Sequence, residues 1–312
     1  METPPEPHPL DFDWRFSQAT IDEIACRIPE NEPLLAVGAP SIARHFIRSS
    51  RMVRLVDRQP FQGVANQKLT DIDENASLIE GFRTAFVDPP WYPEHVKTWV
   101  SWTARCVGID GEIFASIWPE NTRPAGEEEF RTIMAWLATW SDTSIADIVP
   151  RYNLPGFEER ANRSSYTPEL SFSPRKGRLL RVKPHGVPSV VPLNRGNEEW
   201  LRFVINDYQL ALRLRLGDTA LPKITKVPRS ENWQWPYVSR RAPGRELIDI
   251  WSSKNEVAMC RGVEAIAAAL KRVTRAKSNI EFEAAMSPIA RLLDWEIPRP
   301  PYRRTFTWSH QQ

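Results

Sequence analysis

The sequence contains one tetrapeptide with a specific chemical meaning, Asp88-Pro89-Pro90-Trp91, and Tyr92 follows it. An amino group conjugated to an aromatic ring is a weak nucleophile, because its lone pair is delocalised into the ring. It becomes nucleophilic when acceptors bind its two hydrogens and favour a pyramidal nitrogen. The carboxylate of Asp88 and the backbone carbonyl of Pro89 can supply two such acceptors, so the tetrapeptide predicts chemistry on an amine.

The neighbouring features suit the same chemistry. Proline fixes its backbone φ at about −65° and has no N–H, so the segment presents carbonyl groups rather than donors. The rings of Trp91 and Tyr92 can stack on a flat substrate and orient its amine. The tetrapeptide also follows an apolar run, and ligands of open parallel sheets bind outside the carboxyl ends of the strands. A simple turn after a strand is the competing interpretation in a chain with 28 prolines.

The elements that must position these residues alternate from Pro33 onward between short apolar runs and amphipathic helices. This alternation predicts a parallel sheet covered on both faces. Helical spacing of apolar residues follows the first, fourth and fifth runs. Two later strands are expected to close the sheet as an antiparallel pair. The expected strands span residues 34–38, 52–57, 69–73, 83–90 and 111–119, then 144–152 and 177–184.

A D-P-P-W sequence after a hydrophobic strand resembles motif IV of the S-adenosylmethionine-dependent amino-methyltransferases. In that group the tetrapeptide [DNS]-P-P-[YFW] binds the target amine of adenine or cytosine. The tryptophan variant resembles the N6-adenine methyltransferases of the MT-A70 type and several bacterial DNA adenine enzymes. The resemblance covers residues 33–184 and nothing beyond. It implies an α/β, Rossmann-like class I methyltransferase sheet, mostly parallel and closed by an antiparallel strand. It also implies that Asp88, Pro89, Pro90 and Trp91 form the catalytic tetrad.

The resemblance further implies S-adenosylmethionine as the cofactor, and a glycine-rich turn of the form G-x-G after the first strand. Here that turn is Val37-Gly38-Ala39, with one glycine and a proline after it. Taken alone, such a turn is more often a plain strand-to-helix connection. Acidic side chains at the next strand ends can accept hydrogen bonds from ribose hydroxyls or flank the adenine of the cofactor. The candidate cofactor-binding residues are Val37, Gly38, Ala39, Asp57, Asp71 and Asp73.

The C-terminal region, 185–312, is expected to be a helix-rich extension that acts in substrate recognition or as a lid. Trp200, Val204 and Tyr208 lie one helical turn apart and predict a helix. A strand-like segment at 246–253 precedes Ser253 and Glu256, whose spacing predicts a capping box for a helix over 256–276. A last helix is expected at 279–293. The remaining chain divides into an N-terminal arm and helix, 1–32, and the methyltransferase domain, 33–184.

Aromatic and cationic residues alternate in one proline-rich stretch of this extension, as in surfaces that stack bases and hold phosphates. Its candidate nucleic-acid-binding residues are Trp233, Trp235, Arg240 and Arg241. Packing in a core is the stronger interpretation for the two tryptophans, because tryptophan is usually mostly buried. A second basic group surrounds the loop between the last two sheet strands and is typical of a solvated face or of a nucleic-acid groove. Its members are Arg151, Arg160, Arg163, Arg175, Lys176 and Arg178.

Composition excludes several other classes. The 41 basic and 39 acidic side chains give a net charge of +2, too mild for the overall footprint of a nucleic-acid-binding protein. The three cysteines form no C-x-x-C pair, which argues against a disulfide framework or a zinc site, so no metal is expected. Phosphate-loop and G-x-S-x-G motifs are absent from the sequence. Apolar runs are too short to cross a membrane and the N-terminus is unlike a signal peptide, so a cytoplasmic protein is expected.

The leading functional hypothesis is therefore methyl transfer from S-adenosylmethionine to an exocyclic amine, with adenine N6 of DNA or RNA as the first target and nucleic acid as the partner. Two alternatives stay open. One is a transferase that acts on a small amine. The other is a catalytically silent methyltransferase-like subunit that binds a partner, since related adenine enzymes can act as heterodimers. The sequence does not distinguish a monomer from a dimer or heterodimer.

Overall fold

The computed structural model describes residues 6–11, 14–58, 61, 64–119, 122–165, 175–193, 199–205, 207–215, 217–218, 220–237, 242–290, 293 and 295–299, with the side chains of 162–165 left out. The chain divides into two compact units. Unit 1 is formed mainly by Trp14–Leu154 and Ser171–Arg195, and unit 2 mainly by Thr3–Asp13, Pro155–Leu170 and Gly196–Gln312. In the described part of the chain, none of the helices has the length and hydropathy to cross a membrane.

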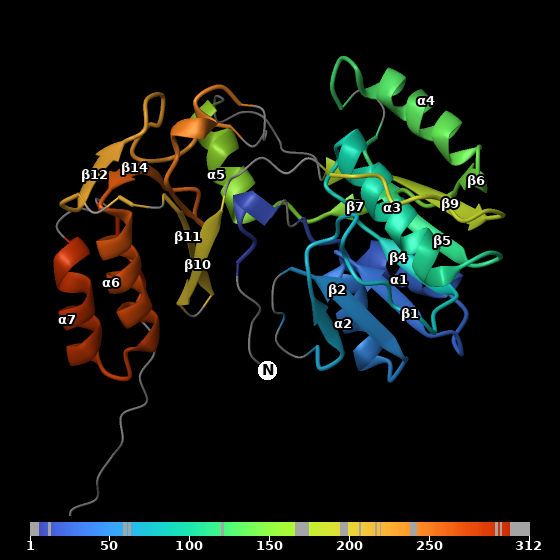
Figure 1. The fold of residues 1–312 in the computed structure, drawn as a ribbon, viewed down its shortest axis with the longest axis horizontal. Helices are drawn as coiled ribbons and strands as arrows, with labels where there is room; N and C mark the ends of the chain where they lie inside the picture. Colours follow the sequence, from blue (N-terminus) through green and yellow to red (C-terminus); the bar gives the residue numbers. More distant parts are fainter. Residues whose placement is uncertain are drawn as a thin grey trace, which may run out of the picture. The chain divides into compact units, whose positions relative to one another are not determined.

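Unit 1 contains a seven-stranded, mostly parallel sheet (Figure 1). Strands β1 to β5 run parallel to one another. Strand β9 is antiparallel to both of its neighbours and closes the sheet. This is the expected Rossmann-like sheet, mostly parallel and closed by an antiparallel strand. The spatial order is β3 (Gln67–Leu69), β2 (Val53–Asp57), β1 (Leu34–Val37), β4 (Thr84–Val87), β5 (Glu112–Ile117), β9 (Arg178–Pro184) and β6 (Ser141–Ile145).

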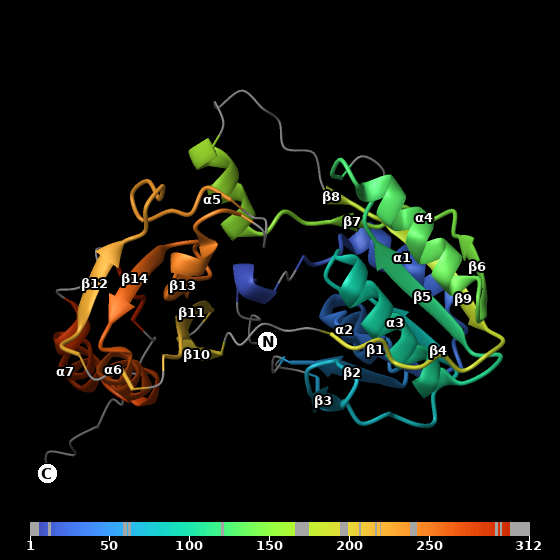
Figure 2. The ribbon, with the colours of Figure 1, turned by 45° about the horizontal axis from the view of Figure 1, so that its top comes forward.

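Helices cover both faces of this sheet (Figure 2). Helices α1 (Gln18–Arg27) and α2 (Pro40–Arg48) pack on one face, and α3 (Pro93–Val107) and α4 (Gly126–Leu137) pack on the other. Every residue of β1 and β4 is buried, as expected of strands that lie between two helical layers. The expected strands and helices of this unit are therefore confirmed to within a few residues, with two exceptions.

The exceptions concern the third strand and the segment after α4. The third strand ends at Leu69, so Asp71 and Asp73 lie beyond it and not within it. The strand expected at 144–152 is two short strands: β6 joins the main sheet, whereas β7 (Arg151–Tyr152) pairs with β8 (Arg175–Lys176) in a separate ribbon. Pro150 explains the division, because proline lacks the N–H that a continuous ladder needs.

Unit 2 contains a five-stranded antiparallel sheet that the sequence analysis did not anticipate, together with the two helices that it did. Helices α6 (Val263–Arg275) and α7 (Asn279–Ala290) share a buried cluster with the sheet. Helix α5 (Gly156–Ser165) also belongs to this unit. The order of the strands in the antiparallel sheet is β10 (Trp200–Ile205), β11 (Tyr208–Arg213), β13 (Ile250–Ser252), β14 (Val257–Arg261) and β12 (Lys223–Lys226).

The helix expected around Trp200, Val204 and Tyr208 is wrong, because these residues lie in the hairpin of β10 and β11. A four-residue spacing fits a strand as well as a helix, since it is a multiple of the two-residue strand period. The β-branched and aromatic residues of this segment favour the strand. Ile205 pairs with Tyr208 at the end of this antiparallel ladder.

The capping box expected at Ser253 and Glu256 is also wrong. Both residues lie in the turn between β13 and β14, where Asn255 adopts a left-handed φ of 65°. The hydroxyl of Ser252, one residue earlier, donates to the Glu256 carboxylate at 2.6 Å and thereby stabilises the turn. The helix begins only at Val263, after strand β14.

Candidate active site

Three strand ends meet at the carboxyl edge of the sheet in unit 1. The Gly38 N–H, directly after β1, donates to the carbonyl of Val56 in β2 at 2.9 Å. On the other side, the Asp88 N–H donates to the carbonyl of Val37 at 3.0 Å. The glycine turn therefore lies between Asp57, the last residue of β2, and Asp88, the first residue after β4. Gly38 and Asp57, expected to bind the methyl donor, thus lie near Asp88, expected to bind the acceptor amine. We call this part of the carboxyl edge the corner.

The Asp88 carboxylate belongs to a chain of hydrogen bonds. The hydroxyl of Tyr152 donates to its Oδ1 at 2.7 Å. The same hydroxyl lies 2.6 Å from the Oγ of Ser116 in β5. Asp88 itself is half-buried, whereas Ser116 and Tyr152 are buried beneath it. The carboxylate is thus held from the side of the protein core.

Aromatic rings fix Tyr152 in this position. Its ring centroid lies 4.4 Å from that of Phe16 and 5.5 Å from that of Trp91, the latter edge to face. Burial raises the pKa of Tyr152 well above its usual value, and the nearby Asp88 carboxylate raises it further. The phenol therefore stays protonated at neutral pH and remains a donor.

The tetrapeptide continues into the start of α3. The Tyr92 N–H donates to the carbonyl of Pro90 at 2.7 Å, a tight turn that precedes the helix. Among the described residues, none donates a hydrogen bond to the carbonyl of Pro89. Trp91 is half-buried, and its own carbonyl accepts a hydrogen bond of 2.9 Å from Arg123. Pro89 itself is buried, and these two hydrogen bonds fix the backbone on its C-terminal side.

Two cationic side chains lie against the aromatic residues of the corner. The guanidinium of Arg175 in β8 lies 4.4 Å from the Trp14 ring centroid and 5.5 Å from that of Trp91. Arg123 lies 5.9 Å from the Tyr92 ring, and its Nε donates to Glu129 at 2.6 Å. The Glu129 carboxylate balances the charge of Arg123, and Arg175 adds a cation beside the rings of Trp14 and Trp91.

Gly38 is the one residue of the cofactor turn whose backbone requires glycine. Its φ of +62° is left-handed. A Cβ at this position would meet the ring of Trp99 and would lie 3.0 Å from the Asp88 carbonyl oxygen. The close approach that requires glycine here is therefore made by the Trp99 ring and the Asp88 backbone. Trp99, on α3, lines the turn and was not anticipated from the sequence.

The other candidate cofactor residues differ in exposure. Asp57 is half-buried at the end of β2, beside the turn. Asp71 is exposed, and Asp73 is half-buried with its Oδ1 accepting from the Asn75 N–H at 2.9 Å. Val37 is buried in the sheet core, and Ala39 is buried among the residues around α2. Asp57 is therefore the acidic residue placed next to Gly38.

The candidate nucleic-acid-binding residues of the extension do not form a described surface. Trp235 is fully buried in unit 2, packed with Trp251, and its ring is closed to an external base. Trp233 is half-buried, with its ring centroid 5.6 Å from that of Trp295. Arg240 and Arg241 lie outside the described residues. Both tryptophans thus contribute to packing, which was the stronger interpretation of their pattern.

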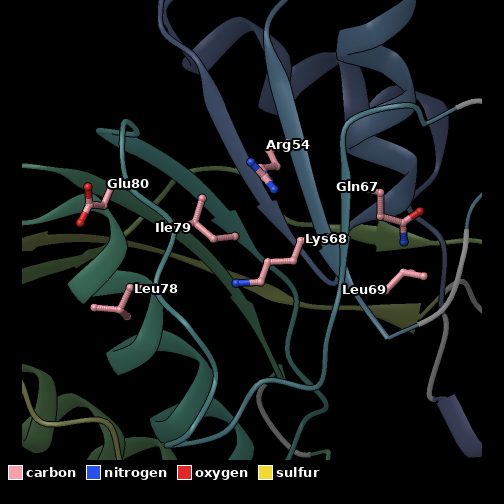
Figure 3. A pocket seen from close by; sticks show the side chains of 7 residues that line it. All are labelled: Arg54, Gln67, Lys68, Leu69, Leu78, Ile79 and Glu80. Atoms are coloured by element: carbon pink, nitrogen blue, oxygen red, sulfur yellow. The ribbon is translucent and has the colours of Figure 1, made fainter.

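A surface hollow of about 620 Å³ lies at the β3 edge of the sheet (Figure 3). None of the candidate site residues lines it. The described residues also contain no cluster of three or more histidine, cysteine or carboxylate side chains that could hold a metal ion. The residues that line the surface hollow are Arg54, Gln67, Lys68, Leu69, Leu78, Ile79 and Glu80.

Sequence reasoning missed Tyr152, Ser116, Arg123 and Trp14 as members of the corner. No local motif marks them, because each comes from a different segment and reaches Asp88 or Trp91 only in the fold. The basic character of the chain around Arg175 was the one available signal, and it does not specify a contact with Trp91.

No protein-family model and no curated protein matches the chain. Solved structures do resemble it. A branched-chain polyamine synthase from Thermus thermophilus is 12% identical, with 61% of this chain and 64% of that chain covered and a TM-score of 0.49. A 16S rRNA N2 methyltransferase from T. thermophilus is 11% identical, with 68% and 52% covered and a TM-score of 0.35. The chain thus spans less than two thirds of either protein.

A third structure, a precorrin-6y methyltransferase from Geobacter metallireducens, is 11% identical, with 55% of this chain and 94% of that chain covered and a TM-score of 0.31. Likenesses at such low identity concern the fold and leave the substrate open.

Proposed function

We propose that the protein transfers a methyl group from S-adenosylmethionine to an exocyclic amine, with adenine N6 of DNA or RNA as the leading target. One observation carries the proposal. Asp88 is half-buried at the carboxyl end of β4, its backbone lies beside the left-handed Gly38 turn of β1, and Tyr152 donates to its carboxylate. Carboxyl ends of neighbouring parallel strands are where this fold binds ligands.

Each residue of the corner has a defined role in this proposal. Gly38 and Asp57 bind the donor, which supplies an electrophilic methyl group on its sulfonium. Asp88 and the Pro89 carbonyl accept hydrogen bonds from the two amine hydrogens and direct the nitrogen lone pair. Trp91 and Tyr92 hold the ring of the acceptor. Catalysis then depends on orientation and on stabilising the charge that develops on nitrogen.

The cations beside the aromatic rings support a nucleic acid over a neutral amine. Arg175 contacts the rings of both Trp14 and Trp91, next to the place proposed for the acceptor ring. A guanidinium there can pair with a phosphate of the substrate backbone. A base inside a duplex would have to leave the stack to reach Asp88.

The proposal is tested by incubating the protein with methyl-labelled S-adenosylmethionine and, separately, with total DNA, total RNA and a polyamine mixture. Label in DNA or RNA that appears as N6-methyladenine after digestion is the expected result. Label in the polyamines alone would establish a small-amine transferase. Absence of label, of calorimetric heat and of thermal stabilisation at millimolar donor would contradict the enzyme proposal, because a donor that binds the folded protein must stabilise it.

A further inference from the structure

We infer that Tyr152 is a positioning residue for Asp88, and that its hydroxyl, supported by Ser116, fixes the carboxylate that binds the acceptor amine. The inference rests on the proposed function for the role of Asp88. The hydrogen-bonded chain itself is a property of the fold and can be tested without any substrate.

The direction of the chain follows from the number of available protons. An ionised carboxylate only accepts, so Tyr152 must give its single hydroxyl proton to Asp88 Oδ1 across 2.7 Å. The tyrosine oxygen is then an acceptor, and Ser116 must donate to it across 2.6 Å. The two hydroxyls thus form a directed relay that ends on Oδ1 and restrains rotation of the carboxylate.

Burial makes this relay rigid. Tyr152 is 2% exposed, and Ser116 has no exposed surface. Phe16 packs on the tyrosine ring and forms an isolated β-bridge with Tyr152. Burial raises the pKa of Tyr152 well above its usual value, so the phenol keeps at neutral pH the proton that it donates to Asp88.

The origin of Tyr152 also favours a role at the site. It comes from β7, a two-residue strand outside the main sheet, in register with Arg175 of β8. The same ribbon therefore brings one hydroxyl to Asp88 and one guanidinium to Trp91. Packing alone would need only the aromatic ring, and a phenylalanine would supply it. The hydroxyl is needed only to donate the hydrogen bond to the Asp88 carboxylate.

The first test is Tyr152→Phe, which removes the hydroxyl and keeps the ring. We expect kcat to fall by about 10-fold to 100-fold, because a hydrogen bond to a charged group is lost, while the Kd for S-adenosylmethionine is unchanged. Ser116→Ala should lower kcat less, since Tyr152 can still donate. The matched control is Tyr208→Phe in unit 2, where a buried tyrosine likewise donates to a carboxylate, Glu256, at 3.1 Å. That variant should lose stability and keep kcat.

The second test needs no activity. The carboxyl pKa of Asp88 is followed by NMR on protein with ¹³C-labelled aspartate, with Asp88→Asn used to assign the signal. A donor to the ionised form lowers a carboxyl pKa, so Tyr152→Phe should raise that of Asp88 by about one unit. Arg175, the charged group of β8 that acts on Tyr152, is retained in the variant. A purely structural tyrosine would leave the Asp88 titration unmoved.

The outcomes separate the two proposals. An active wild-type protein whose Tyr152→Phe variant keeps both its kcat and its Asp88 titration overturns the positioning role. A wild-type protein without transferase activity overturns the proposed function, and the titration still decides whether Tyr152 holds the carboxylate.

Discussion

The chemistry assigned to Asp88 depends on residues that are remote from it in the sequence. A carboxylate at a strand end is usually solvated and free to rotate. Here a buried phenol binds one of its oxygens, and the neighbouring proline carbonyl accepts no hydrogen bond from the described residues. The carboxylate therefore has a defined direction, which an acceptor of an amine hydrogen requires.

Trp91 is expected to contribute mainly to binding of the acceptor ring. Base–aromatic stacking contributes about 1–3 kcal/mol, so Trp91→Ala should raise KM by about 5-fold to 150-fold and also lower kcat, since the ring contacts Tyr152. Trp91→Phe should retain most of the activity. Steady-state kinetics with an adenine-containing oligonucleotide provide the measurement.

Trp136→Ala is the matched control for that variant. Trp136 is also half-buried, packs against the same core cluster and makes an edge-to-face pair, with Trp140 at 5.2 Å. The Trp136→Ala variant should have lower stability and an unchanged KM. An unchanged KM in Trp91→Ala would remove this ring from the site.

At the scale of elements, the site residues that come at the end of a strand could be predicted from the sequence. The site residues that are positioned by tertiary contacts could not. Gly38, Asp57 and Asp88 each end an apolar run, and the runs were placed almost correctly. Tyr152 was placed in a longer strand of the main sheet, because its hydrophobic neighbours resemble a continuation of β6. Its true position depends on pairing with β8, about 25 residues later, which periodicity does not reveal.

The turn after β1 offers a test of local backbone strain. Gly38→Ala places a side chain in the left-handed region, which costs about 1–2 kcal/mol, and against the Trp99 ring and the Asp88 carbonyl. Overpacking of this kind adds about 1–3 kcal/mol. Urea unfolding should therefore show a loss of stability well above the backbone cost, together with weaker donor binding.

Gly81→Ala is the control that isolates the backbone contribution to the loss of stability. Its φ is +88°, and a Cβ there would meet nothing within 4 Å. Gly81→Ala should destabilise the protein by the backbone cost alone and leave donor binding intact. Equal stability losses in the two variants would mean that the Gly38 corner is not crowded.

At the scale of the whole molecule, the sequence predicted the parallel sheet and its helices but not the antiparallel sheet of unit 2. The parallel sheet is readable because both of its faces are buried, which gives continuous apolar runs such as Leu34–Val37. The two edge strands of the unit 2 sheet, β10 and β12, have mixed burial, and β12 is a four-residue strand with two exposed lysines. Such strands resemble loops or helices when only spacing is available.

A nucleic-acid substrate predicts binding that weakens as salt rises. If Arg175 and Lys176 of β8 each contact one phosphate of a single strand, the slope of log K against log salt should be about −1.4. Replacing both by glutamine should remove most of that slope, whereas Lys271→Gln on α6 should not change it. Binding of RNA that is insensitive to salt would contradict a phosphate-binding role for this ribbon.

The most direct test of the account is methyl transfer by Asp88→Ala compared with the wild-type protein, at donor concentrations that calorimetry shows to be saturating for each. The account predicts that the variant binds S-adenosylmethionine with nearly unchanged Kd and loses transfer by roughly 10³-fold, while Asp88→Asn, which keeps one acceptor oxygen, retains measurable activity. Transfer by Asp88→Ala at the wild-type rate, or a loss of donor binding equal to the loss of transfer, would contradict it.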